Sequence, residues 1–115
     1  MIANRTASRA NDLAALFTPK AVSAGCLLHG CGLDALPELI GTTGAFDVVI
    51  NATSASLSGD AIQLPADAIS ADGFAYDMMY GKAPTPFLSA QQAAGVPCFA
   101  DGLGMLVEQA AVAFE

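Results

Sequence analysis

The stretch FDVVIN, residues 46–51, is the clearest buried strand in the sequence, because apolar and β-branched residues run together in it and end at an asparagine. Short apolar runs of this kind alternate along the chain with alanine-rich segments of helical spacing. That alternation is typical of βα units, in which helices flank a parallel sheet. The sequence therefore predicts an α/β fold with a mostly parallel sheet.

The other elements are predicted outward from this strand by apolar runs and by proline, glycine and capping residues. The first helix is expected to end before Pro19, while Thr85, Pro86 and Gly95 are expected to cap, begin and stop the third helix. We expect further strands at residues 1–4, 21–28, 74–78 and 96–100, helices at 8–17, 34–40, 86–94 and 102–114, a glycine-rich turn at 30–32, and a long loop with one helical turn at 54–72.

Composition narrows the class of protein. With 115 residues, of which 54% are hydrophobic and 13% charged, the chain is large enough for one domain with a real core. A net charge of -7 repels polyanions, so no nucleic-acid partner is expected. No apolar run approaches the about 18 residues that a membrane span needs, and no signal peptide is recognisable, so we expect a cytoplasmic protein with no membrane partner.

The cysteines predict neither a disulfide framework nor a metal site. Cys26, Cys31 and Cys98 are odd in number, which suits reduced thiols in a cytosolic chain. Cys26 and Cys31 flank His29, but this spacing lacks the paired ligands of a zinc site, so no metal is expected.

The segment NRTASR, residues 4–9, follows the first predicted strand. In folds that bind NAD, an acidic residue at such a strand end accepts hydrogen bonds from the adenosine ribose, and its charge would repel a 2'-phosphate. No acid stands here; Arg5 and Arg9 can bracket a phosphate, with Thr6 and the first amides of the helix as neutral donors. The segment predicts NADP over NAD, although on this evidence alone a solvated arginine pair at a helix start is an equally good explanation.

Two further segments end strands where ligands bind in open α/β sheets. NATS, residues 51–54, offers Asn51 and Thr53, and YDMMY, residues 76–80, offers Met78 and Tyr80. Taken alone, the first pair equally well satisfies backbone groups in a turn, and methionine and tyrosine are more often core and rim residues.

The predicted last helix has two distinct faces. A stripe at three-and-four spacing is expected to face the core, while Gly102, Met105 and Gln109 fall within about 60° of one another beside it. The stripe consists of Leu103, Leu106, Val107, Ala110, Ala111 and Phe114.

Together, NRTASR, NATS, YDMMY and ADGLGMLVEQAA (residues 100–111) resemble the nucleotide-binding half of the shikimate dehydrogenase family. The resemblance spans nearly all of residues 1–115 and implies a partial Rossmann-type NADP-binding domain whose C-terminal helix borders the substrate cleft. Enzymes of this family reduce 3-dehydroshikimate reversibly to shikimate with NADPH, in the biosynthesis of chorismate and the aromatic amino acids.

The resemblance also implies roles for individual residues. Tyr80 and Gln109 are expected to bind shikimate or 3-dehydroshikimate. The glycine that usually follows NATS is displaced here to Gly59, so this loop departs from the family pattern. The cofactor contacts are expected from Asn4, Arg5, Thr6, Arg9, Asn51, Thr53, Met78, Gly102 and Met105.

In the family, the catalytic lysine and aspartate lie in an N-terminal substrate domain, and the Gly-rich loop lies on the first strand of the cofactor domain. No segment before Asn4 matches either, so we expect a C-terminal fragment with no catalytic residue and little or no turnover of its own. In strand order 3-2-1-4-5-6 the missing strand divides the sheet, and the open edges favour a homo-oligomer. Two alternatives are a quinate/shikimate dehydrogenase paralogue that uses NAD and a non-catalytic nucleotide-binding module.

Overall fold

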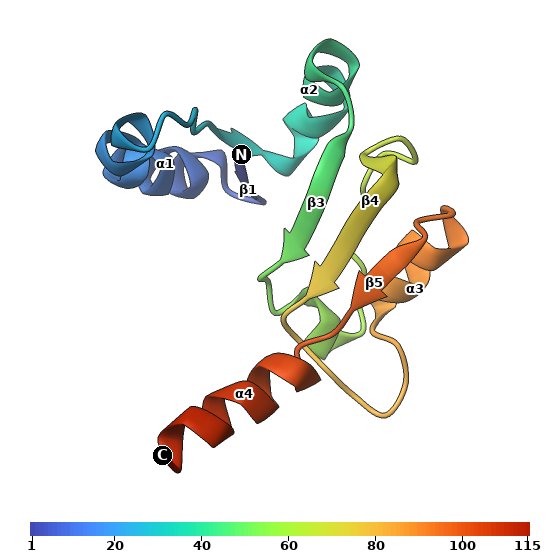
Figure 1. The fold of residues 1–115 in the computed structure, drawn as a ribbon. Helices are drawn as coiled ribbons and strands as arrows, with labels where there is room; N and C mark the ends of the chain where they lie inside the picture. Colours follow the sequence, from blue (N-terminus) through green and yellow to red (C-terminus); the bar gives the residue numbers. More distant parts are fainter. The chain divides into compact units, whose positions relative to one another are not determined.

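The computed structural model describes residues 1–115, except for the side chain of Ser56. The chain forms two compact units, Met1–Gly44 and Ala45–Glu115, each with its own sheet and helices (Figure 1). Every strand pairing is parallel. The predicted α/β class with parallel strands is confirmed, and the architecture agrees with part of a Rossmann-like fold.

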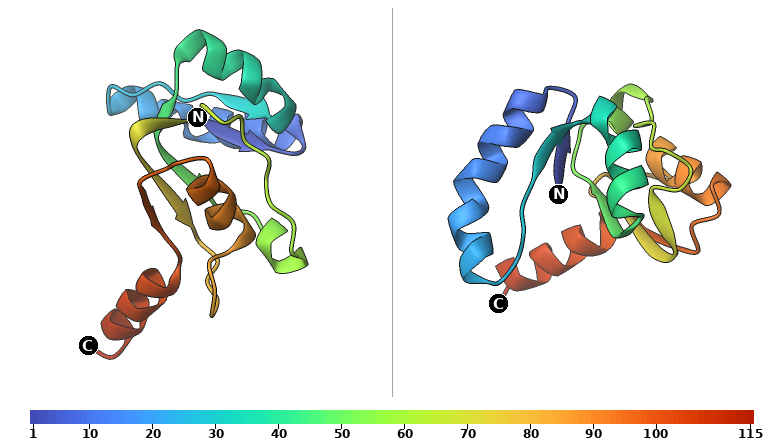
Figure 2. Two further views of the ribbon diagram at one scale, coloured as in Figure 1. Left: turned by 90° about the vertical axis from the view of Figure 1, so that its right-hand side faces the viewer. Right: turned by 90° about the horizontal axis from the view of Figure 1, so that it is seen from above.

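The first unit is a βα unit closed by a second strand. Its parallel pair β1-β2 is joined by α1, which lies along both strands (Figure 2). Ala10 and Ala14 form the buried side of α1. The elements are β1 Ile2–Asn4, α1 Ala7–Ser23, β2 Gly30–Gly32, a 3-10 turn Leu33–Ala35 and α2 Leu36–Thr43.

The second strand corrects two predictions. Residues 30–32, expected as a turn, form β2, and residues 21–28, expected as a strand, contain the end of α1 and irregular chain. The glycines of β2 have no positive φ. A Cβ on Gly30 would lie 2.5 Å from the Ala10 carbonyl oxygen. Glycine is therefore needed for the close approach of α1 to the strand, and not for a turn.

The prediction that the first helix ends before Pro19 is also wrong, because α1 continues to Ser23. A proline inside a helix removes one backbone donor, which leaves the carbonyl of Ala15 without its helical partner. Ala15 is exposed, so water can satisfy that carbonyl. The helix ends four residues later beside Gly25, whose φ of +71° suits a C-terminal stop.

The second unit holds a parallel sheet in the order β3-β4-β5. Helix α3 packs on β4 and β5, and its Phe87 and Leu88 form much of the core with Ala75 (Figure 2). The predicted start of α3 is confirmed, since the Thr85 hydroxyl accepts a hydrogen bond from the Leu88 amide. The elements are β3 Phe46–Asn51, a 3-10 turn Ala55–Ser58, β4 Ile69–Asp77, α3 Pro86–Ala93, β5 Cys98–Ala100 and α4 Leu103–Ala113.

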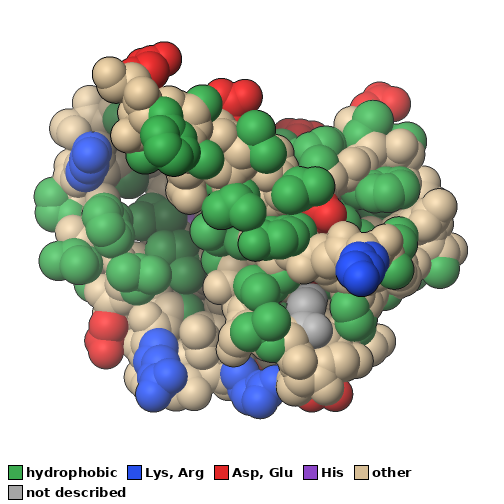
Figure 3. Space-filling model, turned by 90° about the horizontal axis from the view of Figure 1, so that it is seen from below, with side chains coloured by type: hydrophobic (Ala, Val, Ile, Leu, Met, Phe, Trp, Pro, Cys, Tyr) green, Lys and Arg blue, Asp and Glu red, His purple; other side chains and the backbone are tan. Residues whose placement is uncertain are grey.

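Two apolar surfaces of this unit are open to solvent instead of buried as expected. On β3, Val48 and Ile50 are 56% and 59% exposed. Helix α4 leads away from the end of β5 (Figure 1) and buries none of its residues, so its predicted core stripe faces solvent. Hydrophobic side chains are prominent on the face drawn in Figure 3. The stripe is apolar because of its sequence, but nothing among the described residues covers it. None of the described helices is long and apolar enough to cross a membrane.

Candidate ligand-binding site

Three of the predicted segments meet at one edge of the sheet in the second unit. Because β3, β4 and β5 are parallel, their carboxyl ends lie together, with Asn51 paired to Asp77 and Tyr76 to Ala100. The Met78 amide donates to the Asn51 carbonyl oxygen at 3.0 Å, and the Gly102 amide donates to the Met79 carbonyl oxygen at 3.1 Å. The structure thus brings Asn51, Met78 and Gly102 to the same edge.

Asn51 presents an unpaired donor there. Its side-chain oxygen accepts from the Thr53 amide at 3.1 Å and from the Thr53 hydroxyl at 2.7 Å, which organises the turn after β3. These two donors identify the oxygen, so the other side-chain atom is the Nδ2 amide. Asn51 is 3% exposed, and this Nδ2 has no hydrogen-bond partner in the described structure. An unmet buried donor costs about 1–3 kcal/mol, which a ligand oxygen at this edge would relieve.

Gly102 is required by close packing of backbone on backbone. A Cβ at this position would overlap the Met78 carbonyl oxygen and lie 2.7 Å from its carbonyl carbon. The start of α4 is then held by Asp101, whose Oδ1 accepts from the Leu103 amide at 3.1 Å. The first glycine of the Gly-x-Gly sequence therefore fixes the approach of α4 to the end of β4, whereas a Cβ at Gly104 would meet no atom within 4 Å.

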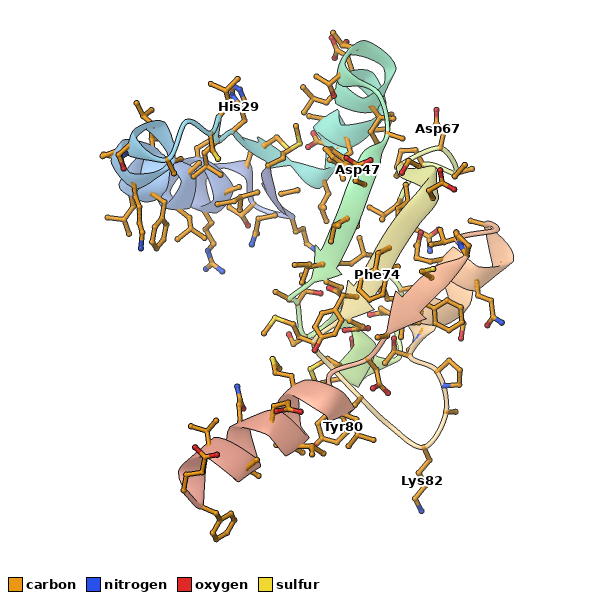
Figure 4. All side chains as sticks on the ribbon, viewed as in Figure 1. His29, Asp47, Asp67, Phe74, Tyr80 and Lys82 are labelled. Atoms are coloured by element: carbon orange, nitrogen blue, oxygen red, sulfur yellow. The ribbon has the colours of Figure 1, made fainter. Side chains whose placement is uncertain are left out.

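Four of the side chains predicted to contact ligands remain at least partly accessible. Met78 and Tyr80 are 40% and 49% exposed on the chain that follows β4 (Figure 4). On α4, Met105 is half-buried and Gln109 is exposed. The sheet edge thus combines a fixed backbone with solvent-accessible side chains of the predicted set.

The four remaining predicted residues surround the start of α1 in the first unit. The Asn4 Oδ1 accepts from the Thr6 amide at 2.9 Å, and this bond shapes the turn between β1 and α1. Arg5, Thr6 and Arg9 are exposed, and neither guanidinium has an ion pair within the described chain. The first turn of α1 carries no acid and no side-chain cap. The positive end of the helix dipole and two arginines together favour an anion.

Sequence reasoning missed Asp77 and Thr85 as parts of the site. Asp77 ends β4 with 0% exposure and accepts a hydrogen bond from the Thr85 hydroxyl at 2.6 Å. The sequence predicts Thr85 only as a helix cap. The available signal is an acid at the end of an apolar strand followed by a Thr-Pro start of a helix, a combination that keeps a carboxylate beside a hydroxyl.

The three cysteines are free thiols that differ in burial. Burial raises the pKa of the Cys31 thiol; the positive N-terminus opposes this rise, and Asp34 adds to it. Cys26 and Cys98 are exposed free thiols. Among the residues whose side chains are described, no group of three or more His, Cys, Asp or Glu is placed to hold a metal ion.

Comparison with known proteins shows a consistent similarity. No protein-family model matches the chain. The chain is 52% identical over 114 residues to the shikimate dehydrogenase (NADP(+)) of Cupriavidus pinatubonensis, covering 99% of the chain and 38% of that protein. Proteins of the same name from Aromatoleum aromaticum and Dechloromonas aromatica are 49% and 48% identical, over 98% and 99% of the chain and 38% of their own length. The chain therefore spans about 38% of the length of the curated relatives it matches.

Proposed function

We propose that this chain is the NADP-binding part of a cytoplasmic shikimate dehydrogenase, which reduces 3-dehydroshikimate reversibly to shikimate. The observation that carries the proposal is the 52% identity over 99% of the chain to a protein named shikimate dehydrogenase (NADP(+)). The placement of the predicted residues at strand ends and at the start of α1 supports it, because these are the positions where open α/β sheets bind nucleotides.

The start of α1 is proposed to bind the 2'-phosphate of NADP. Arg5 and Arg9 supply planar, permanently charged donors, and the uncapped amides of the first helical turn add neutral ones. The Asn4 side chain holds the turn through its bond to the Thr6 amide, which leaves the exposed Thr6 hydroxyl available to the ligand. NAD lacks the phosphate and would gain little from the two charges.

The edge of the second sheet is proposed to bind the nicotinamide and the substrate. NADPH supplies a hydride when bound. Asn51 and Thr53 offer polar groups, while Met78, Gly102 and Met105 offer a surface for a flat ring. Tyr80 and Gln109 combine a phenol and an amide that bind oxygen atoms of shikimate. These residues are proposed to bind and orient the nicotinamide and the substrate.

No residue of this chain is proposed as the group that moves the substrate proton. The Asp77 carboxylate is fully buried, and both of its oxygens already accept hydrogen bonds, from the Met79 amide and from the Thr85 hydroxyl. Asp101 accepts from the Leu103 amide at the start of α4. Because proton transfer by a positioned group contributes about two to four orders of magnitude in rate, we expect little turnover from the chain alone.

The open surfaces of the second unit support self-association. Among the described strands, β3 pairs only with β4, so its other edge is free of strand pairing, and Val48 and Ile50 are exposed on the same strand. Unpaired edges and open apolar faces readily join other chains. We propose a homo-oligomer formed through these edges. Sedimentation at several concentrations should show mass increasing with concentration, whereas a monomer throughout, with slow amide exchange in every strand, would contradict the proposal.

A thermal melt followed by circular dichroism tests the nucleotide proposal. Only binding to the native state raises the melting temperature. We expect NADP to raise it more than NAD does at equal concentration. Equal shifts would favour a paralogue that uses NAD. A shift with both nucleotides but no response to shikimate would favour a non-catalytic nucleotide-binding module.

A further inference from the structure

The carboxylate of Asp77 occupies an unusual place at the end of β4. Its residue is 0% exposed, and a buried carboxylate is tolerated only where hydrogen bonds replace water. One oxygen, Oδ1, accepts from the Met79 amide at 3.0 Å. The other, Oδ2, accepts from the Thr85 hydroxyl at 2.6 Å. The same carboxylate therefore binds both ends of the loop that joins β4 to α3.

Thr85 connects this carboxylate to the core. It is 7% exposed, and its hydroxyl oxygen accepts from the Leu88 amide at 3.3 Å while its proton is donated to Asp77. Phe87 and Leu88, which follow in α3, are 1% and 3% exposed. The hydroxyl thus uses its donor and an acceptor position to tie the start of a core helix to the end of β4.

The backbone between Asp77 and Tyr80 is also held by hydrogen bonds to the end of β3 and to the residue before α4. The Met78 amide is bound to β3 through the Asn51 carbonyl oxygen, and the Met79 carbonyl oxygen is bound by the Gly102 amide before α4. The Met79 amide, the other backbone donor of Met78 and Met79, donates to the Asp77 carboxylate. Met78 and Tyr80 nevertheless keep exposed side chains. Accessible side chains on a backbone that is held by hydrogen bonds are what a preorganised ligand site requires.

We infer that Asp77 is a positioning residue, which sets the orientation of Met78 and Tyr80 through its bonds to the Met79 amide and the Thr85 hydroxyl. The inference rests on the proposed function for the ligand that Tyr80 meets. Asp77 itself does not touch the ligand. A role confined to stability would lower the fraction of folded chain and leave the folded molecules unchanged.

Fluorine NMR separates these two roles, because the chain contains only two tyrosines. In the 115-residue chain labelled with 3-fluorotyrosine, Tyr80→Phe assigns the two resonances. Thr85→Val removes the hydroxyl at nearly constant shape, and Thr85→Ser keeps it. We expect Thr85→Val to move the Tyr80 resonance toward that of free fluorotyrosine, while the Tyr76 resonance, from a ring stacked on Phe74, stays in place. Thr85→Ser should restore the original position.

Ligand titration extends the test. Adding NADP and shikimate should move the Tyr80 resonance of the unmodified chain, with a weakening of apparent affinity by about tenfold in Thr85→Val, as expected for a lost hydrogen bond to a charged group. If the ligands move neither tyrosine of the unmodified chain, the proposed function fails, but the ligand-free comparison still decides the role of Asp77. A Tyr80 resonance that is the same in Thr85→Val and in the unmodified chain overturns the inference.

A measurement without any variant covers the case in which Thr85→Val does not fold. Hydrogen exchange of the unmodified chain should show the Met79 amide protected by about a hundredfold or more, as for amides that open only with local unfolding. The amide of Lys82, an exposed residue in the same loop, serves as the internal comparison. A Met79 amide that exchanges as fast as that of Lys82 would overturn the inference.

Discussion

Replacing Gly102 with alanine should destabilise the second unit strongly. A Cβ there would overlap the Met78 carbonyl oxygen and lie 2.7 Å from its carbon, whereas ordinary contacts begin at 3.4 Å. The carbon atoms must separate by at least 0.7 Å, which also strains the 3.1 Å hydrogen bond from the Gly102 amide to the Met79 carbonyl oxygen. Overpacking together with a weakened hydrogen bond predicts a loss of about 2–4 kcal/mol in the free energy of unfolding.

Urea titration followed by far-ultraviolet circular dichroism measures this loss, and Gly104→Ala is the matched control. It lies two residues further along in α4, with nothing within 4 Å of a Cβ. Alanine is favoured over glycine inside a helix by about 1 kcal/mol, so this variant should be as stable as the unmodified chain or more stable. A Gly102→Ala variant within about 0.5 kcal/mol of the unmodified chain, the range of ordinary surface changes, would refute the reasoning.

Two further predictions concern the first unit and the open helix. At pH 8, Cys31 should react with iodoacetamide more slowly than the exposed Cys26 and Cys98, because burial raises its pKa and restricts access; equal rates, read by mass spectrometry, would contradict this. Burial favours the neutral thiol of Cys31, so its stabilising contribution is complete below about pH 9 and is lost as the pH rises through the higher folded pKa. The free energy of unfolding should therefore differ less between pH 8 and pH 10 in Cys31→Ala than in the unmodified chain. Val107→Thr on α4 should change the free energy of unfolding by less than about 0.5 kcal/mol, because Val107 is 58% exposed; a larger loss in a urea titration would mean that the stripe is covered.

Elements with local signals were predictable from the sequence. Strand β3 has the predicted bounds, because a run of apolar residues bounded by polar ones needs no distant partner to be recognised. The start of α3 was predictable because Thr85 and Pro86 act within one helical turn. Its end was predictable because Gly95, with a φ of +88°, follows the helix and suits a C-terminal stop. The position of Asn51 at a strand end follows from the bounds of β3.

Elements that depend on packing were not predictable. The glycines of β2 signal a turn when read alone, and only the backbone of Ala10 above Gly30 explains them as strand residues. Pro19 signals a helix end, yet α1 continues beyond it. The carbonyl that loses its helical hydrogen bond belongs to Ala15, which is exposed to water. The stripe of α4 has the right spacing for a core, but spacing does not tell which surface covers it. The hydrogen bond between Asp77 and Thr85 joins residues eight apart, a separation that no local sequence pattern indicates.

The central claim is that Arg5 and Arg9, at the start of α1, bind the 2'-phosphate of NADP. Isothermal titration calorimetry with NADP and NAD tests it most directly. The unmodified chain is compared with the double variant Arg5→Ala/Arg9→Ala and with Lys20→Ala, an exposed cation in the last turn of the same helix. We predict that NADP binds more tightly than NAD, and that the double variant loses at least about tenfold in NADP affinity, the effect of one lost charge-assisted hydrogen bond, with little change for NAD. Lys20→Ala should behave as the unmodified chain. Equal affinities for the two nucleotides, or a double variant that keeps its preference for NADP, would contradict the account.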